Sequence, residues 1–102
     1  MDDEIPPLTR AVDPSGSLIY HFWADQTWEG FDSIVKYMQK YWSAIVTQSS
    51  DDIYSRTWEL ISDGVPIRIR HDSQSGNSFF RSDGGDNVLL DRMYDDLTEK
   101  LK

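Results

Sequence analysis

The sequence predicts an α+β fold, with a mainly antiparallel sheet of about five or six strands and two amphipathic helices packed on one face. The first observation is a hairpin pattern, in which the strand-like runs 57–61 and 65–70 flank a short turn. The second is a helical spacing of apolar residues in two segments, 28–41 and 89–101. The third is that strand-like runs follow one another through short connections, which favours antiparallel pairing.

The hairpin is the most clearly specified element. Its turn contains Asp63-Gly64, a pair that accepts the positive φ angles of a type I′ turn. The second strand alternates two sets of residues, Val65, Ile67 and Ile69 on one face and Pro66, Arg68 and Arg70 on the other. We expect Arg56 to join the cationic face from the partner strand. That face is either a solvated surface paired with Glu59 or a groove that contacts a carboxylate or phosphate.

The chain before this hairpin contains another hairpin and the first helix. Residues 8–12 and 17–23 read as strands, joined by a turn in which Pro14 presets φ and Gly16 closes the loop. Thr27 is a suitable N-cap for a helix over 28–41. Its predicted apolar face consists of Trp28, Phe31, Ile34, Val35, Met38, Tyr41 and Trp42.

The remaining elements are two short strands and the second helix. Residues 43–48 predict a strand, 49–52 a polar turn and 77–81 a last strand. Asp86 or Asn87 can cap the second helix. Its apolar stripe consists of Leu89, Leu90, Met93, Tyr94, Leu97 and Leu101.

The length of 102 residues predicts one domain over 8–102, preceded by a flexible tail over 1–7. The absence of cysteine excludes disulfides and thiolate metal sites. With no signal-like segment and no apolar run of membrane-spanning length, we expect a cytoplasmic protein.

The formal charge of −8 comes from 18 acidic and 10 basic residues. It disfavours direct binding of nucleic acid or of an anionic membrane, since such ligands select basic proteins. The charge favours a cationic partner, and it also serves solubility.

Candidate catalytic and metal-binding groups are few. A pair of His21 and His71, oriented by Asp72, would permit acid–base chemistry, but a structural or surface role is favoured for each histidine. The neighbouring carboxylates do not match a calcium loop, and Gly84-Gly85 lacks a phosphate-binding fingerprint. We therefore expect no metal, no cofactor and no catalytic residue.

The favoured candidates form a protein-binding surface, because carboxylates surround aromatic residues that can act as anchors. For Trp28 a core position is the stronger expectation. The candidate residues are Asp25, Trp28, Glu29, Asp32, Asp51, Asp52, Tyr54 and Asp72.

The order of these features resembles the immunity proteins of contact-dependent growth inhibition systems. The resemblance covers about half of the chain, in a tryptophan-containing hairpin over 58–72, the stretch Gly-Asn-Ser-Phe-Phe over 76–80 and a closing helix over 91–101. These are fold residues, so the resemblance transfers no binding residue by position.

The resemblance implies a cytoplasmic inhibitor that forms a 1:1 complex with a basic toxin, typically a nuclease, and blocks its active site without chemistry of its own. Complementary charge would speed that association. Two alternatives stay open, an acidic adaptor or regulatory module and a small enzyme that uses His21 or His71.

Overall fold

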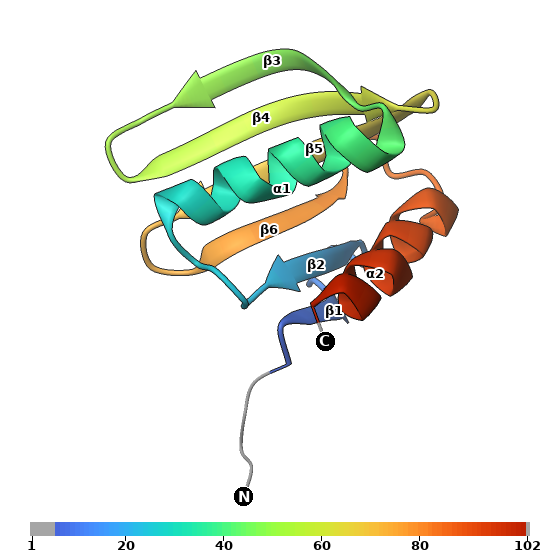
Figure 1. Ribbon diagram of the computed structural model, residues 1–102, viewed down its shortest axis with the longest axis horizontal. Coiled ribbons are helices and arrows are strands. Elements are labelled where there is room, and N and C mark those ends of the chain that lie inside the picture. The colour runs from blue at the N-terminus through green and yellow to red at the C-terminus, as the bar shows by residue number, and fades with distance from the viewer. Residues whose placement is uncertain (1–5, 102) are drawn as a thin grey trace, which may run out of the picture.

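The chain folds into one six-stranded sheet with two helices, as seen in a computed structural model in which residues 6–101 are described (Figure 1). The elements in chain order are β1 (Leu8–Val12), β2 (Leu18–Phe22), α1 (Trp28–Trp42), β3 (Ile45–Asp51), β4 (Ser55–Ser62), β5 (Val65–Asp72), β6 (Gly76–Arg81) and α2 (Val88–Lys100). This arrangement confirms the predicted α+β class.

The strand order is β1-β2-β6-β5-β4-β3, and every neighbouring pair is antiparallel. Four strands, β3, β4, β5 and β6, follow one another as a meander. After β2 the chain crosses the sheet through α1 and resumes at the far edge with β3, so that β6 returns to lie beside β2.

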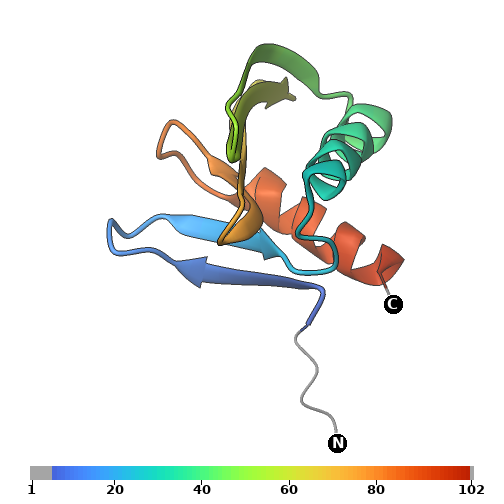
Figure 2. The same ribbon diagram turned by 90° about the vertical axis from the view of Figure 1, so that its left-hand side faces the viewer.

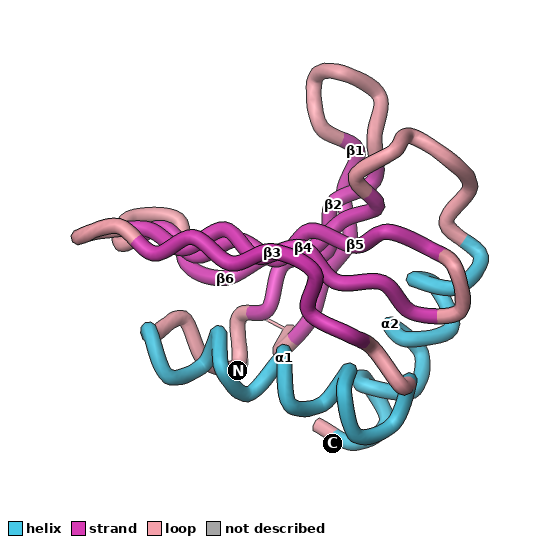
Figure 3. The backbone as a smooth tube through the Cα atoms, turned by 90° about the horizontal axis from the view of Figure 1, so that it is seen from above, coloured by secondary structure: helices cyan, strands magenta, loops and turns pink. Residues whose placement is uncertain are grey.

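Both helices lie on the same side of the sheet (Figures 2 and 3). The side chains between the helices and the sheet form the core, which includes the fully buried Tyr20, Phe31, Leu60, Phe79 and Met93. Among the described residues no helix covers the opposite side of the sheet, which we call the open face.

The turn between β4 and β5 has the predicted conformation. Asp63 has φ 52° and Gly64 has φ 75°, as a type I′ turn requires. Ser62 is paired with Val65 directly across the turn, so the turn sets the register of the whole hairpin.

The first helix begins where it was predicted and ends one residue later. The Thr27 side chain accepts a hydrogen bond from the Gly30 N–H, and Ser43 ends the helix in the left-handed region at φ 53°. One expectation was wrong, because Tyr41 is 52% exposed whereas Tyr37 is buried. The reason is that α2 packs against this flank of α1, where the Tyr37 hydroxyl donates to Asp96.

Two boundary predictions need correction or comment. β3 continues through Ser49, Ser50 and Asp51, which were expected in a turn, because their backbone pairs with β4 despite the polar side chains. Of the predicted tail, residues 1–5 lie outside the described residues, as does residue 102 at the other end. The Pro7 carbonyl accepts hydrogen bonds from the N–H groups of Trp23 and Ala24.

Within residues 6–101, no helix combines the length and apolar character needed to cross a membrane.

Candidate protein-binding site

The eight predicted interface residues gather at one end of the sheet. Three segments meet there: the beginning of α1, the turn between β3 and β4, and the turn between β5 and β6 (left-hand side of Figure 1). The turns are joined by a hydrogen bond from the Ser73 N–H to the Tyr54 carbonyl. Residues far apart in the sequence therefore present one surface.

The buried side chain of Arg56 connects α1 with β3. It is only 5% exposed and forms ion pairs of 3.0 Å with Asp51 of β3 and with Asp32 of α1. It also donates to the carbonyl of Trp28 at 3.2 Å. A buried guanidinium needs such partners, because an unpaired buried charge is strongly destabilising.

The position of Arg56 corrects the prediction that it shares a face with Arg68 and Arg70. Arg56 is paired in register with His71, whereas Thr57 is paired with Arg70 and Glu59 with Arg68. Since successive side chains of a strand alternate between faces, Arg56 faces α1 and the other two arginines lie on the open face. Arg68 forms an ion pair with Glu59, the solvated pairing that the sequence favoured.

Three aromatic rings surround the Arg56 guanidinium, those of Trp28, Phe31 and Trp58, at 4.4–5.0 Å from the ring centroids. Trp28 also packs edge-on against His71, so its ring belongs partly to the core. Trp58 donates its indole N–H to Asp51 at 2.8 Å. This cluster holds the carboxylates of α1 and β3 in defined positions.

The turn between β3 and β4 carries two exposed apolar residues. Ile53 is 77% exposed and Tyr54 is 71% exposed, and both follow Asp51 and Asp52 in the sequence. Ile53 was not among the predicted interface residues. The signal that indicates it is an isolated apolar pair within an otherwise polar turn, where packing into the core is not possible.

Six carboxylates surround this turn and the beginning of α1, against the single guanidinium of Arg56. We call this surface the acidic end, and it consists of Asp25, Glu29, Asp32, Asp51, Asp52, Ile53, Tyr54 and Asp72.

Hydrogen bonds keep several of these carboxyl groups ionised. The Trp58 indole N–H, and then Arg56, lower the pKa of Asp51. The pKa of Asp25 is lowered by the Thr27 side chain, and that of Asp72 by the backbone N–H of Gln74. Donors that favour the charged form maintain the negative potential of the acidic end.

Asn77 fixes the loop that leads into α1. Its side-chain amide donates to the carbonyls of Asp25 and Thr27 at 2.8 and 3.0 Å, and its oxygen lies 2.8 Å from the His71 Nδ1 atom.

Gly30 is required in the first turn of α1, since a Cβ atom on it would lie 2.5 Å from the Asp25 carbonyl oxygen. The close approach explains why the first turn of α1 contains a glycine.

The structure does not bring His21 and His71 together. His71 is paired in register with Asn77 and Asn77 with Phe22, the residue that follows His21. The two imidazoles therefore lie on opposite faces of the sheet. His71 is buried against α1, while His21 stacks on Trp23 on the open face. The paired acid–base arrangement considered from the sequence is not formed.

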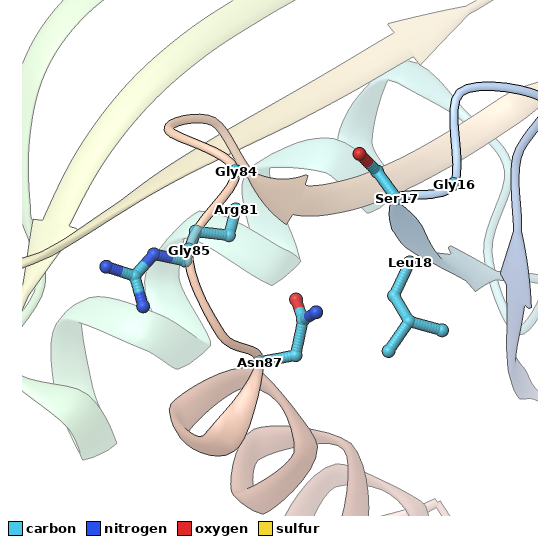
Figure 4. Close-up of a pocket in the computed structure, with 7 residues that line it drawn as sticks. All are labelled: Gly16, Ser17, Leu18, Arg81, Gly84, Gly85 and Asn87. Carbon is cyan, nitrogen blue, oxygen red and sulfur yellow. The ribbon is translucent and has the colours of Figure 1, made fainter.

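The Gly84-Gly85 loop borders a hollow of about 90 Å³ between β6, α2 and the β1–β2 turn (Figure 4). Arg81 donates to Asp83 and to the carbonyl of Asp86, and in Figure 4 its guanidinium points away from Ser17 and Leu18. With these donors engaged, the loop offers no free cation to a phosphate. Across residues 6–101, no cluster of three or more histidine or acidic side chains could hold a metal ion.

Comparisons with known protein families, with curated proteins and with solved structures find no match for this chain. The functional proposal therefore depends on the residues and geometry of this chain. The feature that distinguishes this molecule is the acidic end, where a dense set of carboxylates surrounds two exposed apolar side chains.

Proposed function

We propose that this protein is a cytoplasmic immunity protein that binds a basic toxin domain of the nuclease class in a 1:1 complex through its acidic end. The observation that carries the proposal is the exposed Ile53–Tyr54 pair, set among carboxylates on a turn that is hydrogen-bonded to the neighbouring β5–β6 turn. The family resemblance of the sequence supports the same reading. The protein would inhibit without catalysing a reaction.

The apolar pair has the composition of a binding anchor. Interfaces concentrate their affinity in a few large side chains that become fully desolvated, with polar groups at the rim. Ile53 and Tyr54 would supply the centre, and Asp51, Asp52 and Asp32 the rim.

The Arg56 cluster supports this function by organising the surface before a partner arrives. Asp32 and Asp51 are held by ion pairs to one buried guanidinium. Side chains that are already ordered lose less conformational entropy on binding. Arg56 forms ion pairs with only these two carboxylates of the acidic end. The other carboxylates would meet the cations of a substrate groove.

The mechanism would be exclusion of the nucleic acid. A nuclease groove is cationic because it binds phosphates. An acidic protein seated in it competes for the same charges and blocks access to the catalytic centre. Long-range attraction would raise the association rate, and added salt would lower it.

Growth protection tests this function directly. The chain would be coexpressed with the basic domain encoded by the neighbouring gene, and growth compared with and without it. We expect rescue, together with a complex whose association rate falls as salt is raised. Failure of the chain to bind that domain would contradict the proposal.

Matched variants locate the contact. Ile53→Ala should weaken binding by about tenfold or more, as expected for an anchor residue. Ile45→Ala is the control, because Ile45 is also exposed, at 67%, and begins β3 at the far end of that strand. Equal losses from both substitutions would place the contact elsewhere.

The alternative function, an adaptor, would use the same surface, and growth rescue distinguishes it from an immunity protein. An adaptor would bind a protein through the acidic end without protecting cells from a toxin. Binding without rescue would therefore favour the adaptor.

A further inference from the structure

The open face of the sheet contains a hollow that shares only Asp72 with the acidic end. Its volume is about 140 Å³, which is room for a group of several non-hydrogen atoms. The hollow lies above β6, between side chains of β2 and β5. Its lining residues are Ile19, His21, Arg70, Asp72, Ser75, Gly76, Ser78 and Phe80.

The sequence of β6 creates the hollow. Ser78 is paired with His21 on one side and with Arg70 on the other. Because neighbouring strands are about 4.8 Å apart, the backbones of His21 and Arg70 are separated by roughly 10 Å across a short serine side chain. Gly76 continues the depression, and Phe80 closes it at the other end.

Arg70 supplies a cation whose guanidinium makes no direct side-chain contact among the described residues, although its charge acts on the neighbouring Asp72. Within residues 6–101 its guanidinium takes part in no hydrogen bond, ion pair or ring contact, whereas Arg68 on the same face is paired with Glu59. In a chain with a charge of −8, an arginine left unpaired beside a hollow is available to an anionic group. A guanidinium can bind a carboxylate through two parallel hydrogen bonds.

Asp72 supplies the opposite charge at the same hollow. It lies two residues after Arg70 on the same face of β5, and the backbone positions of such residues are about 6.7 Å apart. Its Oδ1 atom accepts the N–H of Gln74 at 2.8 Å, which holds the carboxylate in place. The hollow thus presents a positive and a negative group side by side.

Two further features describe the rest of the site. The His21 ring borders the hollow beside Ser78, and its buried Nδ1 atom makes no hydrogen bond within the protein. At the end near Phe80, Ile19 adds a second apolar wall. Charged groups therefore lie at one end of the hollow and apolar surface at the other.

We propose that this hollow binds a small zwitterion of the α-amino acid class. The carboxylate would lie between Arg70 and His21, the ammonium would lie against Asp72, and a neutral side chain would lie against Ile19 and Phe80. In an amino acid the two charged groups are close together, and Arg70 and Asp72 occupy neighbouring positions on the same face of β5. A simple anion would be repelled by Asp72, and a simple amine by Arg70.

The test is a titration of the ¹⁵N-labelled full chain, followed by two-dimensional NMR. The probes are L-alanine, L-valine, L-leucine and L-phenylalanine. At least one should produce saturable shifts at Arg70, Ser78 and the indole of Trp23, which stacks on His21. For valine, 3-methylbutanoate lacks the ammonium and isobutylamine lacks the carboxylate. Each should bind at least about tenfold more weakly, because each loses one charged contact.

Two variants on β5 assign the contacts. Arg70→Ala should abolish amino acid binding, while the control Arg92→Ala, on α2 at the other side of the sheet, should leave it unchanged. Asp72→Asn should remove the preference for valine over 3-methylbutanoate. The spectra themselves report whether each variant is folded.

Three outcomes would overturn the proposal. One is the absence of saturable shifts at β6 with all four amino acids. Another is equal loss of binding in Arg92→Ala and Arg70→Ala. The third is binding of 3-methylbutanoate as tight as that of valine, which would indicate a site for simple carboxylates.

Discussion

Polar residues have opposite surroundings on the two faces of the sheet. On the face beneath the helices, Arg56, Asn77 and His71 are buried, and each of them is hydrogen-bonded. On the open face, Arg68 is 41% exposed, with an ion pair to Glu59 and a contact over the Phe80 ring, and the Arg70 guanidinium forms no ion pair among the described residues. The same residue type, arginine, therefore organises the structure on one face and is available for binding on the other.

This difference shows where stability and function separate in a small acidic protein. A buried polar group is tolerated only when its hydrogen bonds are satisfied, so the buried residues on the covered face fix the position of α1. An exposed polar group is hydrated whether or not it is paired, so its loss has little effect on folding. Four predictions test this contrast.

The largest effect is expected for Arg56→Ala. It removes the bonds to Asp32, Asp51 and the Trp28 carbonyl and leaves a void among three rings. We expect a loss of about 3 kcal/mol in the free energy of unfolding, measured by urea denaturation. Arg56→Met should recover part of it by filling the void. A loss below about 1 kcal/mol would show that the cluster does not hold the fold together.

Asn77→Ala should have the next largest effect. It leaves the carbonyls of Asp25 and Thr27 and the His71 imidazole without their partner. The expected loss is about 2 kcal/mol, since unsatisfied buried polar groups are destabilising. The neighbouring Ser78→Ala, on the open face, should change stability by less than about 0.5 kcal/mol. Similar losses in both variants would contradict the contrast between the faces.

Acidification should reveal the contribution of Asp51. Hydrogen bonds from Trp58 and Arg56 lower its pKa in the folded protein below the ordinary value of 3.8. A lowered folded pKa means that the stabilisation is fully present above about pH 4 and is lost as the pH falls through the folded pKa. Asp51→Asn should therefore lose less stability than the wild type when the pH is lowered from about 5 to about 2, with stability measured as the denaturation midpoint. Parallel curves would show that the carboxylate contributes nothing.

Arg68→Ala should have the smallest effect. The Arg68–Glu59 pair lies on the open face, where both partners remain partly exposed. We expect a loss of at most about 0.5 kcal/mol, and high salt should remove most of it. A loss comparable to that of Arg56→Ala would mean that the two faces do not differ in this way.

Local patterns predicted most of the elements because they depend on neighbouring residues. Asp63-Gly64 specified the turn conformation, and Thr27 the start of α1. The burial of Tyr37 rather than Tyr41 could not be predicted, because it depends on where α2 packs. The extension of β3 through Ser49–Asp51 likewise depends on pairing with β4, which polar side chains do not indicate.

The candidate site was predicted in composition but not in assembly. The carboxylates and Tyr54 were identified from charge and residue type, and the structure places them at one end of the sheet. Arg56 was assigned to the wrong face, because counting along a strand fixes which residues share a face only when the register is known. Ile53 was missed because its exposure depends on the position of the turn.

The sequence by itself determined the fold class, the two amphipathic helices, the central hairpin and the strongly acidic character. These follow from spacing, turn chemistry and composition, all of which are local or additive properties. Only the tertiary structure decided the strand order, the burial of Arg56, the separation of His21 from His71 and the hollow above Ser78. Each of these depends on which strands become neighbours, and that choice is made by long-range packing of the core.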